Sequence, residues 1–171
     1  MKKILTIFFI LFFVPKSLYA DSLYFIDFKY ILNESNAGKK AQNFLKSKLE
    51  NGIKKLKDKE LNIQEEEKKV IQQKKIVSAE EYKKKVTGLR NKVSALQKER
   101  STLLNDVSKL RLKAKNELLR NLNPILETYM KEKKIRIVLD KKSILLADEN
   151  LNITKDIMKI LNQKLKSIKL N

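Results

Sequence analysis

The stretch YKKKVTGLRNKVSALQKERSTLLNDVSKL, residues 82–110, decides the fold that this sequence predicts. Apolar residues recur in it at alternating steps of four and three, and only Arg100 interrupts the row. The row consists of Tyr82, Val86, Leu89, Val93, Leu96, Leu103, Val107 and Leu110. A heptad row of this kind forms one side of a seam between two helices, so it requires a partner helix.

The partner helix is expected directly upstream, where apolar residues recur every seven positions. These residues are Leu49, Leu56, Ile63, Val70 and Val77. The alternate seam positions hold Ile53, Glu60, Glu67 and Lys74. Only half of this seam is therefore apolar beyond Ile53, and we expect the outer part of the helix pair to be thinly packed and easily opened.

A turn between the two rows makes the helix pair a hairpin. Ser78 and Glu81 have the spacing of a capping box, with Ser at the cap and Glu at the third helical position. A second helix is therefore expected to begin near Ala79 and to run back along the first. The sequence predicts an antiparallel coiled-coil arm over 46–115, with its tip near 77–80.

The flanks of the arm, 21–45 and 116–171, predict a small body that contains β-structure. Residues 22–28 are expected to form a strand, and a helix is expected to begin at the cap-type residues Asn33 and Ser35 and to continue to about Val77. After Ala114 a new apolar row appears, consisting of Leu118, Leu122, Ile125 and Tyr129. Pro124 falls inside this row and is expected to bend or break the helix.

The C-terminal part of the body predicts two strands and a last helix. Residues 134–140 and 143–148 are expected to form a strand pair joined by Lys141 and Lys142. Thr154 is expected to cap a final helix that extends to about Lys169. The fold class is therefore α+β and predominantly helical, with a long antiparallel helical-hairpin arm on a small β body.

Composition limits the chemistry that the chain can perform. The 171 residues include 39 Lys and Arg against 20 Asp and Glu, a net charge of +19, with no His and no Cys. Without these two residues there is no Ser-His or Cys-His nucleophile and no zinc site of the usual ligands, so we expect neither an enzyme nor a cofactor. The basic excess suits nucleic acid, an anionic membrane surface or an acidic protein.

The first twenty residues have the layout of a secretory signal peptide. Lys2 and Lys3 precede an apolar run over 4–14, Pro15 ends the run, and Ala20 offers a cleavage point before Asp21. The run is shorter than the roughly 20 residues that span a bilayer, which argues against an uncleaved membrane anchor. Export argues against binding to chromosomal DNA. Among the basic residues of the tip, Tyr82 is the single aromatic residue on which a base could stack, which also argues against a nucleic-acid partner.

The small body also predicts self-association. A core of this size, without disulfide or metal, is marginal, and its short strands leave open edges. A closed oligomer in which strands of several copies join would remove both problems, although this reasoning does not give the copy number. The residues expected at that interface are Leu23, Phe25, Ile135, Ile137, Leu139, Ile144 and Leu146.

The order of these elements, together with short motifs at both ends, resembles the Skp family of OmpH-like periplasmic chaperones. The N-terminal motifs are Ile26-Asp27, Ile31-Leu32-Asn33-Glu34-Ser35 and Ala37-Gly38-Lys39-Lys40-Ala41. The C-terminal motifs are Val138-Leu139-Asp140, Ile153-Thr154-Lys155-Asp156-Ile157 and Ile160-Leu161-Asn162. The resemblance implies a homotrimer with a shared barrel and three projecting arms. It also implies a periplasmic holdase that keeps unfolded outer-membrane proteins soluble without nucleotide.

The arm tip holds the candidate contact residues for such clients or for anionic lipid headgroups. From 68 to 92 there are nine basic residues against two acidic ones, a net of +7. The candidates are Lys68, Lys69, Lys74, Lys75, Tyr82, Lys83, Lys84 and Lys85. Two alternatives remain open: the charges are merely a solvated face, or the chain is an exported coiled-coil adaptor that binds an anionic envelope surface and holds no clients.

Overall fold

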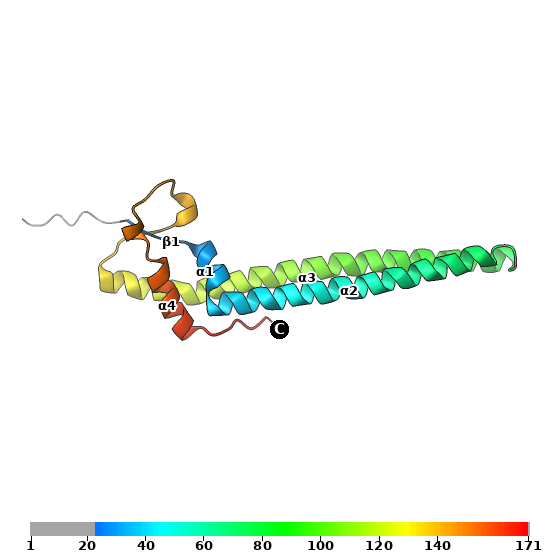
Figure 1. The fold of residues 1–171 in the computed structure, drawn as a ribbon, viewed down its shortest axis with the longest axis horizontal. Helices are drawn as coiled ribbons and strands as arrows, with labels where there is room; N and C mark the ends of the chain where they lie inside the picture. The colour runs from blue at the N-terminus through cyan, green and yellow to red at the C-terminus, as the bar shows by residue number, and fades with distance from the viewer. Residues whose placement is uncertain (1–22, 171) are drawn as a thin grey trace, which may run out of the picture.

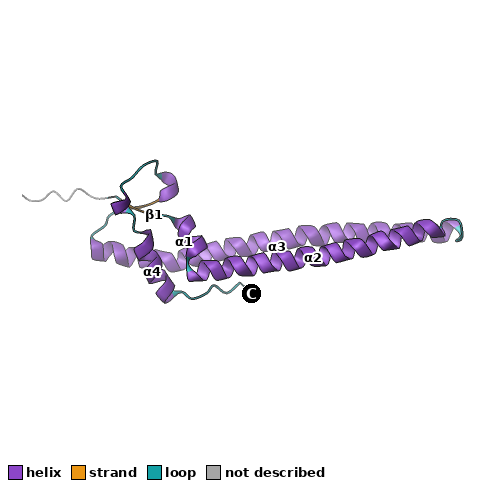
Figure 2. Cartoon of the chain, in the orientation of Figure 1, coloured by secondary structure: helices purple, strands orange, loops and turns teal. Residues whose placement is uncertain are grey.

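The structure, a computed structural model, describes residues 23–170 and consists of a long two-helix arm with a small body at one end (Figure 1). Helix dominates the chain, as Figure 2 shows, and the strands are short. The elements in order are β1 (Tyr24–Ile26), α1 (Phe28–Glu34), α2 (Asn36–Gln73), α3 (Ala79–Lys133), β2 (Val138–Asp140), two 3₁₀ turns (Lys141–Ser143 and Glu149–Leu151) and α4 (Thr154–Lys164).

The arm is the predicted antiparallel hairpin of α2 and α3, and its turn lies where the capping motif placed it. The Ser78 hydroxyl accepts a hydrogen bond from the Glu81 backbone N–H at 3.2 Å and caps the start of α3. Glu80 and Glu81 lie in the first turn of α3, where negative charge suits the helix dipole. A local capping signal therefore fixed the position of the arm tip.

The start of the body differs from the expectation of a strand over 22–28. The strand β1 ends at Ile26, because Asp27 caps a separate helix, α1, by accepting from the Tyr30 backbone N–H at 2.7 Å. Ser35 then ends α1 with an extended backbone and caps α2. Asn33 lies within α1, so Ser35 alone is the cap of the long helix.

The two strands form a parallel pair, and the predicted hairpin of 134–140 with 143–148 is wrong. Tyr24 pairs with Val138, and Ile26 pairs with Asp140. Parallel strands need a long connection, and here the whole arm is that connection. The Asp140 side chain accepts from the Lys142 backbone N–H and bends the chain into a 3₁₀ turn, so residues 144–148 do not return along β2.

Pro124 lies inside α3 without ending it, so the helix is not broken there, and the alternative of a bend stays a prediction. Proline has no backbone N–H, so the Arg120 carbonyl, four residues earlier, receives no helical hydrogen bond. Pro124 and Arg120 are both exposed, so water can bond to this carbonyl instead. Leu122 and Ile125, on either side of the proline, are buried in the body core. Burial of one face therefore carries the helix through the proline.

The body core lies where α1, α3 and α4 meet. Its most buried members are Ile31, Ala37, Leu118, Leu122, Ile157 and Leu161, all of them inaccessible to solvent. The new apolar row predicted after Ala114 is therefore confirmed as the face of α3 that enters this core. The phase shift in the row marks the transition from the arm seam to the body.

The last helix is shorter than expected and is followed by an extended tail. Helix α4 ends at Lys164 rather than near Lys169, and the tail returns along the base of the arm (Figure 1). Leu170 is buried there with Ala41, Leu45, Val107 and Ala114. The small side chains of the two alanines leave space between α2 and α3 for the leucine.

Thr154 is the first residue of α4 and not its cap. Its hydroxyl accepts from the Asp27 backbone N–H at 2.8 Å and donates to Asn152 Oδ1 at 2.5 Å. The same oxygen of Asn152 accepts from the Thr154 backbone N–H at 3.1 Å. Thr154 therefore ties the start of α4 to the end of β1.

Within residues 23–170, no helix combines the length and the apolar character that crossing a membrane requires. The predicted signal peptide over 1–20 lies outside the described residues.

Candidate functional site

Two surfaces of the described chain are candidates for function: the thinly packed outer arm and the exposed apolar face of the body. Residues 23–170 contain no cluster of three metal-ligating side chains.

The proximal arm, nearest the body, is closely packed. Gly52 of α2 faces Leu103 of α3, and a Cβ atom at position 52 would lie 2.5 Å from both terminal carbons of that leucine. The two helices approach closely at this level because glycine has no side chain. Leu56 on α2 and Leu96 on α3 are the outermost buried residues of the arm.

The distal arm, residues 57–95, contains no buried side chain. Ion pairs cross between the helices at the start of this region: Lys59 to Glu99 at 2.5 Å, Lys92 to Glu66, and Arg100 to Glu60 at 3.5 Å. Arg100 interrupts the apolar row of α3 and Glu60 is the first charged residue in the seam of α2, so these two interruptions face each other. Exposed pairs of this kind each contribute at most ~1 kcal/mol, and they hold the distal arm weakly.

A cleft opens between the helices of the distal arm, with a volume of about 490 Å³. Its apolar wall is formed by Ile63, Val70, Val86, Leu89 and Val93, together with the ring of Tyr82. Ile71, Glu67, Arg90 and Ser94 complete the lining. The cleft exists because the complete apolar row of α3 faces a row of α2 in which Glu67 and Lys74 replace apolar residues. We call it the distal cleft.

The predicted tip residues fall into three groups by their burial and their bonding. Tyr82 is half-buried and lines the distal cleft. Lys85 is half-buried and bonded, to Glu81 at 3.0 Å and to Gln73 Oε1 at 2.6 Å, so part of its role is structural. The other six are exposed, and within residues 23–170 their ammonium groups form no ion pair; they are Lys68, Lys69, Lys74, Lys75, Lys83 and Lys84. Six free cations therefore surround the outer end of the arm.

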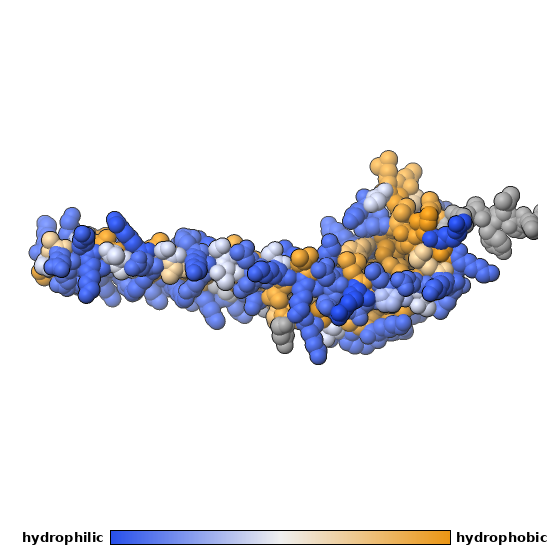
Figure 3. Space-filling view, turned by 180° about the vertical axis from the view of Figure 1, so that it is seen from behind, coloured by the Kyte–Doolittle hydropathy of each residue, from blue (hydrophilic) through white to orange (hydrophobic). Residues whose placement is uncertain are grey.

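The residues predicted at the oligomer interface differ in how far they are buried within the single chain. Phe25 and Ile135 are buried within the chain itself. Ile144 is half-buried, while Leu23, Ile137, Leu139 and Leu146 are exposed. Leu145, which the sequence reasoning missed, is fully exposed because the segment after β2 is not a strand and both neighbouring leucines project from it. Figure 3 shows apolar side chains gathered on the body and a largely hydrophilic arm.

The comparisons with known proteins agree with this architecture. A family model described as outer membrane protein (OmpH-like) matches residues 22–161. The chain belongs to the OmpH-like family. This is a family of chaperones and not of enzymes.

A solved structure from Caulobacter crescentus, described as a candidate outer membrane chaperone of OmpH-like type, has the same fold. The TM-score is 0.79 at 18% sequence identity, and the alignment covers 86% of this chain and 87% of that one. No curated protein matches the chain significantly. The family match ends at Leu161, so the tail that packs on the arm base lies beyond it.

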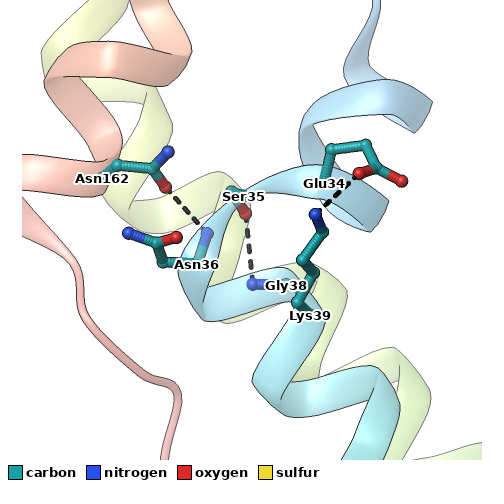
Figure 4. Close-up of polar contacts among 6 residues, drawn as sticks. All are labelled: Glu34, Ser35, Asn36, Gly38, Lys39 and Asn162. Atoms are coloured by element: carbon teal, nitrogen blue, oxygen red, sulfur yellow. Dashed lines mark hydrogen bonds and ion pairs between the residues drawn. The ribbon is translucent and has the colours of Figure 1, made fainter.

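The N-terminal motif that carries the family likeness builds the joint between body and arm (Figure 4). The Ser35 hydroxyl accepts from the Gly38 backbone N–H at 3.1 Å, and Lys39 pairs with Glu34 at 2.9 Å. Asn162 of α4 accepts from the Asn36 backbone N–H at 2.8 Å. The two hydrogen bonds satisfy backbone N–H groups of the first turn of α2 from within the chain, so Gly38 and Lys39 of the motif have a structural role.

Proposed function

We propose that this chain is an ATP-independent holdase chaperone of the periplasm. It binds unfolded outer-membrane β-barrel proteins and prevents their aggregation before membrane insertion. The observation that carries the proposal is the distal arm, which keeps apolar side chains along its length but buries none between Leu56 and Leu96. Many weak apolar contacts can hold an unfolded chain without fixing its conformation, and their number supplies the affinity.

The charge of the tip supports the same function. Six lysines without ion pairs, among the described residues, attract acidic clients and raise the rate of encounter. This attraction is screened by salt, because the charges are exposed. A chaperone of this kind therefore captures acidic clients faster at low ionic strength.

Assembly as a homotrimer is the second part of the proposal. The segment 137–146 exposes four large apolar side chains, those of Ile137, Leu139, Leu145 and Leu146. In addition, β2 pairs with β1 along one edge, and its other edge has no partner strand in the two-stranded sheet of the described residues. Three copies that join these segments into a shared barrel would cover the leucines and pair the open strand edge. The arms of the three copies would then project around a common space.

Sedimentation equilibrium tests the assembly. Leu146→Asp replaces a side chain that is 91% exposed in the single chain, so its fold should persist while the trimer dissociates. Leu61→Asp is the matched control, because Leu61 is also exposed but lies in the distal arm, away from the body. Dissociation by both variants, or by neither, would contradict this interface.

The holdase function is tested by diluting a urea-denatured outer-membrane barrel protein and following light scattering. The mature chain should suppress aggregation at near-stoichiometric amounts, whereas a coiled-coil adaptor would not. A shortened chain, in which a short Gly/Ser turn replaces residues 60–98, tests the role of the arm. It keeps the ion pair between Lys59 and Glu99, which then lies next to the new turn. It should keep the oligomeric state and lose most of the protection. Full protection by the shortened chain would refute the role of the arm.

A further inference from the structure

The distal cleft differs from the rest of the arm surface. It is the place where α3 presents a row of apolar side chains that α2 does not cover. Val93 is 44% exposed, and Val86 and Leu89 are only half-buried, although all three belong to the seam. The exposure of seam residues at one site distinguishes the cleft from the isolated apolar residues elsewhere on the arm.

The size of the cleft limits what can enter it. Its volume of about 490 Å³ lies within the usual range of pockets for small ligands, roughly 300–1,000 Å³. It is therefore large enough for a few large side chains and too small for a folded element. Because the cleft lies along the groove between two helices, an extended chain can pass through it and leave at both ends.

Charge determines which extended chain fits. Arg90 lies in the lining. Lys68 and Lys69 lie on the outer part of α2 and Lys74 directly follows its end, and none of the three forms an ion pair among the described residues. These cations favour acidic groups beside the apolar contact. Glu67, also in the lining, offers its carboxylate as an acceptor for backbone N–H groups, which a peptide has and a headgroup phosphate lacks.

We propose that the distal cleft is a discrete peptide-binding subsite, which takes large apolar side chains from an extended segment that also carries acidic residues. This proposal rests on the proposed holdase function and deepens it. The arm then holds a client at a defined point on each subunit as well as by dispersed contacts. Segments with apolar and acidic residues in close succession bind there first.

A reporter in the cleft makes binding visible at this site alone. The chain contains no Trp, so Tyr82→Trp introduces a single indole into the cleft lining. The probe is a Trp-free peptide of twelve residues with two Phe and two Leu interspersed with Asp. Binding should shift the indole emission to the blue and saturate with peptide concentration. A peptide with Lys in place of Asp should bind at least tenfold more weakly.

A matched pair of variants locates the binding. Ile71→Ser changes a cleft-lining residue that is 59% exposed, and Ile76→Ser changes a nearby isoleucine that is 81% exposed and lies outside the lining. In the reporter background, Ile71→Ser should weaken peptide binding several-fold, and Ile76→Ser should leave it unchanged. Circular dichroism checks that both variants keep their helix content. The proposal would be overturned if both variants lost peptide binding equally, or if the peptide shifted the indole emission in neither the reporter chain nor its variants.

Other occupants give different results. Anionic phosphatidylglycerol vesicles that shift the emission while the peptide does not would show a lipid site and overturn the peptide assignment. A shift that depends on protein concentration without peptide would show that a second copy fills the cleft, which also overturns it. If Ile71→Ser loses peptide binding but the unmodified chain never suppresses aggregation, the holdase function fails and the subsite remains. If aggregation is suppressed but the peptide does not bind, only the subsite fails.

Discussion

Gly38→Ala should destabilise the joint between body and arm more than any other single-methyl change at a glycine of this chain. A Cβ atom at position 38 would lie 2.0 Å from the Leu32 carbonyl oxygen, and 2.9 Å from both the Leu32 carbonyl carbon and Ser35 Oγ. Ordinary contact begins near 3.4 Å. Since two of the three obstructing atoms are backbone, a change of rotamer cannot relieve the clash.

The size of the effect follows from two losses and one gain. Overpacking in a tight site costs about 1–3 kcal/mol, and displacement of the Ser35 hydroxyl from its cap position costs about 1 kcal/mol more. Alanine gains up to ~1 kcal/mol over glycine in a helix. With the full gain, we therefore expect a net loss of about 1–3 kcal/mol, a large share of the ~5–15 kcal/mol of a typical domain.

The other two glycines are the controls, because they differ only in what surrounds the added carbon. Nothing lies within 4 Å of a Cβ at Gly88, so Gly88→Ala should stabilise the chain by up to ~1 kcal/mol. At Gly52 the obstructing atoms belong to the flexible end of Leu103, so Gly52→Ala should cost about 1 kcal/mol.

Urea unfolding followed by circular dichroism, at one protein concentration, gives the three free energies of unfolding. The expected order of stability is Gly88→Ala, the unmodified chain, Gly52→Ala and Gly38→Ala. If Gly38→Ala unfolds at the same urea concentration as the unmodified chain, or if Gly88→Ala is the least stable, the reasoning from the Cβ positions is wrong.

Three further predictions concern other parts of the chain. Burial, followed by the hydrogen bond to Asp156, raises the pKa of Tyr129 to about 12, so the stability that the neutral phenol contributes is complete below pH 10 and is lost as the pH rises towards 12. Tyr129→Phe should therefore flatten the decline in denaturation midpoint between pH 10 and pH 12, and an unchanged decline would contradict the assignment. Leu170→Ala should cost about 2 kcal/mol and increase amide exchange at the arm base, whereas no change in either would show that the tail does not stabilise the arm. Mass spectrometry of exported protein should find a chain that begins at or near Asp21, and a full-length species would refute cleavage.

The arm could be predicted from the sequence because its determinants are local. Heptad spacing places Leu56 and Leu96 on facing helices, and the Ser78 cap needs only the next three residues to mark the tip. The thin packing of the outer arm was also predictable, because charged residues at seam positions cannot be buried without partners. Long amphipathic helices are the part of a fold that short-range patterns describe best.

The body required the tertiary structure. Residues 22–28 alone did not separate β1 from the cap of α1, and the Thr154 hydroxyl that accepts from the Asp27 backbone N–H at this point lies 127 residues away in the sequence. Pro124 is tolerated because buried neighbours hold α3 on one face, and β2 pairs with β1 across the whole arm rather than with residues 144–148. In each case the deciding contact lies far away in the sequence or depends on which face is buried. Local periodicity therefore determined the arm, and long-range packing decided how the body closes around it.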